Sequence, residues 1–303
     1  MRIQFFTTTA KWFFLFFIIV FISGIYSAFH LASVVEKNND SDLQHRINLE
    51  LNQISLNVQE ALLRYEYSLQ GLRASIHAIG INNFNYQTHL AYFKSRDYAK
   101  EFPGTRGFGV IKKVSQAELA TFLTSARAER NGEFELKQLD NPQDPLFIIQ
   151  YIEPEANNLQ AVGLDIGSES NRRLAAINSA ASGVPQLTGP ITLVQANQHK
   201  LHGFLLLLPF FKDDLAQKVV AGWVYSPLLI NEIIDEVANN NKSFTIDIAD
   251  IYINEATLFY QNDASTQVND RFTVRKIINL YGRQWEVAIS PSDAFIASLN
   301  YRN

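Results

Sequence analysis

The chain has 303 residues, of which 47% are hydrophobic, so it can bury a sizeable core in one large or two small domains. Its formal net charge of -4 argues against nucleic acid as the main partner. The absence of cysteine excludes disulfides, thiolate metal sites and cysteine nucleophiles.

The N-terminal segment predicts a membrane anchor. Residues 12–35 contain no Lys, Arg, Asp or Glu, and about 20 apolar residues suffice for a helix to cross the hydrocarbon core. Arg2 and Lys11 precede this run and acidic residues follow it, so the positive-inside rule predicts residues 1–11 in the cytoplasm and the bulk of the chain outside. A cleaved signal peptide is the alternative, although a signal core is usually shorter.

Residues 36–85 predict a long stalk helix. Its apolar stripe permits two interpretations, a helix that packs on its own domain or a stalk that also pairs with a second copy. We favour domain packing for the second half, leave both open for the first half, and expect a homodimer through the stalk. The stripe consists of Leu51, Ile54, Val58, Ala61, Tyr65, Leu69, Leu72, Ile76 and Ile79.

Residues 86–226 predict an α+β module with an antiparallel sheet, because short strand-like runs alternate with helical ones. A helix is expected over residues 87–98, and a capping box at Ser115–Glu118 is expected to open a helix that ends near Arg130. A further helix should end at Gly183, which precedes Pro185. The expected strands are GFGVIKKV, FELKQL, LFIIQYIEP, ITLVQ, GFLLLLPFF and KVVAGWVYS, with a turn around Ala196–Gln198.

A second, smaller module is expected after a linker helix. The linker covers residues 227–239 and should begin at Pro227, because proline suits the first helical turn. Four strand-like runs in residues 240–290 predict the second antiparallel sheet. Residues 291–303 look like the start of another helix, so we expect the complete protein to continue.

The usual catalytic signatures are missing from the sequence. It has no Gly-x-Ser-x-Gly elbow, phosphate loop, dinucleotide fingerprint or His-Glu-x-x-His. His199 and His202 offer two nitrogens for a metal, but no third histidine or carboxylate lies close in sequence, so an exposed turn is the preferred interpretation. We therefore expect no enzyme and no cofactor, and a hydrolase is the least favoured hypothesis.

Asp165 is the most unusual candidate because it ends an apolar run. Aspartate is disfavoured in strands and needs partners when buried. One interpretation is a cap, in which the side chain of Asp165 or Ser168 accepts hydrogen bonds from the unpaired backbone N–H groups of a helix that starts near Asn171. The other is a carboxylate at the mouth of a ligand pocket, with Leu187 as a wall or main-chain contact. Three further residues are predicted to line that pocket: Tyr151, Phe204 and Leu206.

The order of motifs between residues 98 and 226 resembles the CHASE domains, which are extracellular sensory domains of bacterial receptors and plant cytokinin receptors. The resemblance implies a stalk helix and two PAS-like modules, with the ligand in the membrane-distal one. It also implies that Asp165 hydrogen-bonds the ligand and that the backbone at Leu187 contributes, without implying cytokinin as the ligand. The matching positions are Phe102-Pro103-Gly104, Pro154, Asn157, Asp165, Arg172 or Arg173, Gly183, Leu187-Thr188, Gly203-Phe204 and Pro209.

The sequence therefore predicts a periplasmic sensor anchored in the inner membrane, which binds an unknown small molecule. Receptors with CHASE domains usually continue into a second membrane helix and a histidine kinase, diguanylate cyclase or phosphodiesterase. The alternative is a structural or protein-interaction domain without a small ligand.

Overall fold

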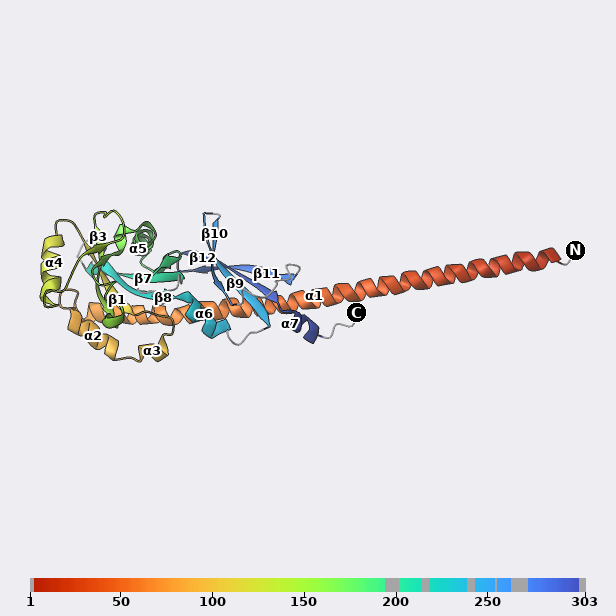
Figure 1. The fold of residues 1–303 in the computed structure, drawn as a ribbon, viewed down its shortest axis with the longest axis horizontal. Helices are drawn as coiled ribbons and strands as arrows, with labels where there is room; N and C mark the ends of the chain where they lie inside the picture. The colour runs from red at the N-terminus through yellow and green to blue at the C-terminus, as the bar shows by residue number, and fades with distance from the viewer. Residues whose placement is uncertain are drawn as a thin grey trace.

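One helix, α1 (Ile3–Ile79), runs along the whole molecule (Figure 1). The computed structural model describes residues 3–193, 202–213, 218–238, 243–253, 255–262 and 272–299. No break separates the expected anchor from the expected stalk. The helix ends at Ile79 rather than near residue 85, because Gly80 adopts φ +90° and its N–H closes the last turn on Ile76 O.

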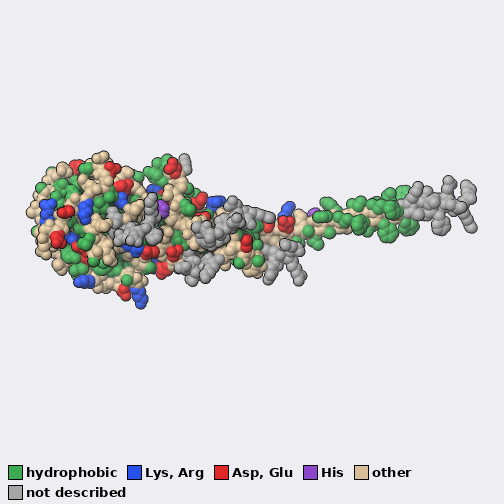
Figure 2. Space-filling view, viewed as in Figure 1, with side chains coloured by type: hydrophobic (Ala, Val, Ile, Leu, Met, Phe, Trp, Pro, Cys, Tyr) green, Lys and Arg blue, Asp and Glu red, His purple; other side chains and the backbone are tan. Residues whose placement is uncertain are grey.

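The first half of α1 projects away from the remainder of the chain. Its apolar window has a mean hydropathy of 2.2, and none of it is buried by the protein. Figure 2 shows hydrophobic side chains along this projecting helix, whereas charged side chains are mixed among the others on the rounded head. An exposed, uncharged helix of this length is what a lipid bilayer accommodates.

The distal module is built on an eight-stranded sheet in the order β2-β4-β3-β1-β8-β7-β5, with β6 paired to β7. All the pairs are antiparallel except β2 with β4. The strands are β1 (Phe108–Val114), β2 (Lys137–Gln138), β3 (Leu146–Glu153), β4 (Leu164–Asp165), β5 (Gln186–Leu187), β6 (Ile191–Thr192), β7 (His202–Asp213) and β8 (Lys218–Leu229).

Helices cover both faces of this sheet and create two cores. The α1-side core includes Phe204 and Leu206 of β7 together with the buried face of α1. The α5-side core includes the intervening Leu205 and Leu207. Burial on both faces explains why β7 is a nearly continuous hydrophobic run. The helices are α2 (Tyr86–Lys94), α3 (Tyr98–Glu101), α4 (Leu119–Ala128) and α5 (Ser170–Ser182), and two 3₁₀ turns are η1 (Glu155–Asn157) and η2 (Ile166–Ser168).

The proximal module contains a four-stranded antiparallel sheet in the order β10-β9-β12-β11. The α1-side core continues into it, so that Val58 and Trp285 belong to the same cluster as Phe204. Its strands are β9 (Phe244–Tyr252), β10 (Glu255–Gln261), β11 (Val274–Leu280) and β12 (Arg283–Pro291), and the flanking helices are α6 (Ile230–Ala238) and α7 (Asp293–Ser298).

Several expected element boundaries were wrong. Pro227 lies in β8, where its carbonyl accepts the N–H of Arg106, and α6 begins only at Ile230. The helix expected over residues 87–98 divides into α2 and α3, and the strand expected in FELKQL shrinks to β2. Glu118 does bond the N–H of Ser115, but α4 starts one residue after this turn. The turn expected at Ala196–Gln198 lies outside the described residues.

Candidate functional site

Asp165 ends β4 and is completely buried. Its Oδ1 accepts the N–H of Phe147 at 2.8 Å and the N–H of Gly167 at 2.9 Å. Asp165 therefore links β4 to β3 and caps η2. The start of α5 is capped instead by Glu169, whose carboxylate accepts the N–H groups of Asn171 and Arg172. The cap expected near Asn171 is thus present, but another acid provides it.

The second carboxyl oxygen of Asp165 is not satisfied by the protein. Oδ2 is buried and has no hydrogen-bond partner among the described residues. Burial raises the pKa of Asp165 above its ordinary value, while the N–H groups of Phe147 and Gly167 and the charge of Arg173 act in the opposite direction. A buried acceptor without a partner is costly, so this oxygen is suited to an N–H or O–H from a bound molecule.

Arg173 fixes the surroundings of Asp165. Its guanidinium donates to Pro145 O at 3.0 Å and Gly167 O at 3.2 Å, and it stacks over the Phe147 ring at 4.7 Å. These partners are the residues whose N–H groups Asp165 binds or lie within two residues of them. Arg173 therefore braces the backbone around the carboxyl group and places a positive charge near it.

Leu187 and the two predicted β7 residues lie on the α1 side of the sheet. Leu187 is paired with Leu206 in the ladder, and its N–H donates to Tyr281 O of the proximal module at 2.8 Å. Phe204 contacts the ring of Trp285, with the centroids 5.4 Å apart. Asp165 contacts Phe147 and Gly167 within the distal module, whereas Leu187 contacts Tyr281 and Phe204 contacts Trp285 of the proximal module. These contacts do not bring the predicted residues around one cavity.

Tyr151, the remaining predicted residue, is also in the α1-side core. It stacks on the buried His89 with the ring centroids 5.6 Å apart. Its hydroxyl donates to Glu129 Oε2 at 2.6 Å, and burial with this carboxylate raises its pKa. Through Glu129, Tyr151 reaches a groove that sequence reasoning did not find.

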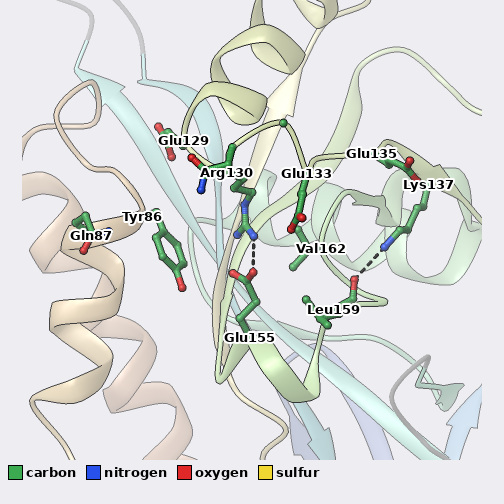
Figure 3. Close-up of a pocket in the computed structure, with 12 residues that line it drawn as sticks. Tyr86, Gln87, Glu129, Arg130, Glu133, Glu135, Lys137, Glu155, Leu159 and Val162 are labelled. Carbon is green, nitrogen blue, oxygen red and sulfur yellow. Dashed lines mark hydrogen bonds and ion pairs between the residues drawn. The ribbon is translucent and has the colours of Figure 1, made fainter.

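This groove has a volume of about 590 Å³, and Figure 3 shows residues that line it. Its lining includes residues of α2 and residues just after α4, and these helices lie at the end of the molecule farthest from the N-terminus (Figure 1). In Figure 3 Arg130 and Glu155 point toward one another, 2.7 Å apart, and Lys137 donates to Leu159 O at 2.9 Å. The closely spaced charged residues of ERNGEFE (residues 129–135) are the sequence feature that could have indicated this groove. The lining residues are Tyr86, Gln87, Glu129, Arg130, Asn131, Gly132, Glu133, Glu135, Lys137, Glu155, Leu159 and Val162.

Within the described ranges, no three His, Asp or Glu residues come together in a way that could hold a metal ion. His202 is exposed at the start of β7, and His199 lies outside these ranges. The chemistry that the described residues offer is hydrogen bonding and charge pairing.

Comparisons with known proteins agree with this architecture. The CHASE domain family model matches residues 82–260. An extracellular ligand binding receptor from Desulfohalobium retbaense DSM5692 is 14% identical with a TM-score of 0.51, over 80% of this chain and 39% of that one, so this chain spans about two fifths of that receptor. The periplasmic sensory domain of the Campylobacter jejuni chemoreceptor Tlp1 is 8% identical with a TM-score of 0.52, over 87% of this chain and 98% of that one.

No curated protein matches the chain. At these identities the two solved structures show a shared fold alone. The apolar N-terminal helix together with a sensory head fits a single-pass membrane protein. The family model covers more than half of the chain, and the chain therefore belongs to the CHASE domain family of sensory input domains.

Proposed function

We propose that this chain is the ligand-binding input unit of a receptor. The N-terminal part of α1 anchors it in the inner membrane, with its head in the periplasm, and the distal module binds a small molecule. Ligand binding favours one arrangement of that module, and the helices pass the difference to an output module such as a kinase or cyclase.

One observation carries this proposal, the buried Oδ2 of Asp165 that has no hydrogen-bond partner among the described residues. It lies in the distal module at the position where the CHASE resemblance implies a ligand contact. The ligand then carries an N–H or O–H donor that reaches Oδ2, while Oδ1 keeps its two backbone bonds. Tyr151, Phe204 and Leu206 are buried in strands β3 and β7 of the same sheet and support the site by fixing those strands.

The experiment compares Asp165→Asn with Asp140→Asn in the full chain. Asparagine retains an acceptor for the N–H groups of Phe147 and Gly167 but loses the carboxylate, and Asp140 is an exposed control in the loop after β2. A thermal-shift screen against amino acids, organic acids and purines finds compounds that stabilise the native state.

We expect at least one such compound to stabilise the wild type and Asp140→Asn, and to lose most of its effect on Asp165→Asn. Equal stabilisation of both variants contradicts the role of Asp165. If no compound in the screen stabilises the wild type, the result favours a structural or interaction domain without a small ligand.

We also propose that the receptor is a homodimer joined along α1. Leu49, Leu56 and Leu63 are spaced by seven residues on the outer face of the helix, and their exposed fractions are 56%, 50% and 38%. A seven-residue repeat of leucine is the pattern by which two parallel helices pair. The membrane would hold two such helices parallel.

A further inference from the structure

A short segment of the distal module is bonded to a turn of the proximal module. Leu187 N–H, on β5, donates to Tyr281 O at 2.8 Å. Tyr281 and Gly282 have φ of +46° and +79° and form the two-residue turn between β11 and β12. The Gln186 side chain lies so close to Gly282 that an added Cβ would come within 1.7 Å of Gln186 Oε1. Residues 186–187 and the turn are therefore in direct contact.

On the distal side, this segment is held by the start of α5. Asn171 Oδ1 accepts the N–H of Gly189 at 2.8 Å, and Arg172 donates to Thr192 O at 3.0 Å. Asp165 caps η2, which directly precedes α5. A displacement at Asp165 that moves the first turn of α5 thus also moves the chain from residue 187 to 192.

On the proximal side, the turn contacts the stalk. Tyr281 packs against the α1-side core, and burial together with the nearby Glu66 carboxylate of α1 raises the pKa of its hydroxyl. Leu56 and Leu63 of α1 line a groove of about 400 Å³ together with Tyr281. The residue after the turn, Arg283, is fixed by a buried ion pair with Asp250.

We propose that the contact between residues 186–189 and the turn at residues 281–283 transmits the state of the distal module to α1. This inference rests on the proposed ligand contact at Asp165. Hydrophobic packing in the shared core is non-directional and therefore depends little on the orientation of β5. A hydrogen bond weakens steeply when its geometry changes. The bond from Leu187 N–H therefore favours one arrangement of β5 over another. The N–H of Leu187 then couples the modules instead of holding the ligand.

The test needs no ligand and uses the full chain in lipid nanodiscs. Because the chain has no cysteine, Glu60→Cys can carry a single nitroxide label on α1 beside the groove that Tyr281 lines. Asn171→Ala removes the acceptor for Gly189 N–H, while Asn178→Ala changes an exposed asparagine on the same helix. We expect Asn171→Ala to shift the line shape of the label, and Asn178→Ala to leave it unchanged.

Two further variants make the result specific to this contact. Asn171→Asp keeps an acceptor and should restore the wild-type line shape. Tyr281→Ala removes the ring that lines the groove on α1, so adding Asn171→Ala to it should no longer shift the label. An unchanged line shape in Asn171→Ala, or an equal shift when Tyr281→Ala is also present, overturns the inference. Either result leaves the ligand-binding comparison of Asp165→Asn untouched, so the two proposals fail separately.

Discussion

The backbone around Asp165 explains why an aspartate ends an apolar strand. The sequence offered two interpretations of this residue, a cap and a ligand contact, as alternatives. In the structure Oδ1 accepts two N–H groups, as the cap requires, and Oδ2 accepts none from the described residues, which leaves it available for the proposed ligand. Burying a carboxylate costs less free energy when backbone N–H groups bind one of its oxygens than when both oxygens lack partners.

At this scale we predict that Asp165→Ala lowers stability, not only ligand binding. Alanine leaves the buried N–H groups of Phe147 and Gly167 unpaired, and each such group costs about 1–3 kcal/mol. The midpoint of thermal unfolding should fall clearly for Asp165→Ala and much less for Asp165→Asn. Equal midpoints for these two variants would show that the backbone bonds contribute little.

At the scale of elements, α1 shows what periodicity can and cannot predict. The stripe from Leu51 to Ile76 is buried against the chain's own modules, whereas Ile79, its last predicted member, is 38% exposed. Both halves of the stripe therefore pack on the chain's own domain. The long strands β3, β7 and β8 were predictable from apolar runs. By contrast, β2, β4, β5 and β6 have two residues each, too few for a periodic pattern, so long-range pairing alone defines them.

The candidate site was only partly predictable for the same reason. Asp165 was found because its residue type conflicts with its apolar surroundings. The assignment of Leu187, Phe204 and Leu206 to the same pocket required knowing which face of the sheet each residue occupies. A shift of one residue moves a strand side chain to the opposite face, and sequence reasoning could not fix the register.

The second prediction concerns the outer face of α1. A disulfide between two copies should form at Leu56→Cys in the full chain in nanodiscs, because equivalent positions of a seven-residue repeat face each other in a parallel pair. Leu174→Cys, on an exposed face of α5, is the control and should remain monomeric. Cross-linking at both positions would indicate random collision, and cross-linking at neither would argue against pairing along this face.

At the scale of the whole molecule, α1 and the core on its face join the two modules into one unit. Phe204 of the distal sheet packs on Phe259 and Trp285 of the proximal sheet, with ring centroids 5.0 Å and 5.4 Å apart. The same cluster includes α1 residues from Leu43 to Ile76. Such a continuous core couples the modules in stability, and a ligand that stabilises one of them also stabilises the other.

Trp285→Ala tests this coupling. The side chain is fully buried, and its removal leaves a cavity that costs about 3–5 kcal/mol. Because its neighbour Phe204 belongs to the distal sheet, we expect hydrogen exchange to accelerate in β7 and β8 as well as in β9 and β12. Ile277→Ala, at a position 53% exposed on β11, should change neither module. Faster exchange confined to the proximal sheet would mean that the modules unfold independently. Each module would then pack on α1 without stabilising the other.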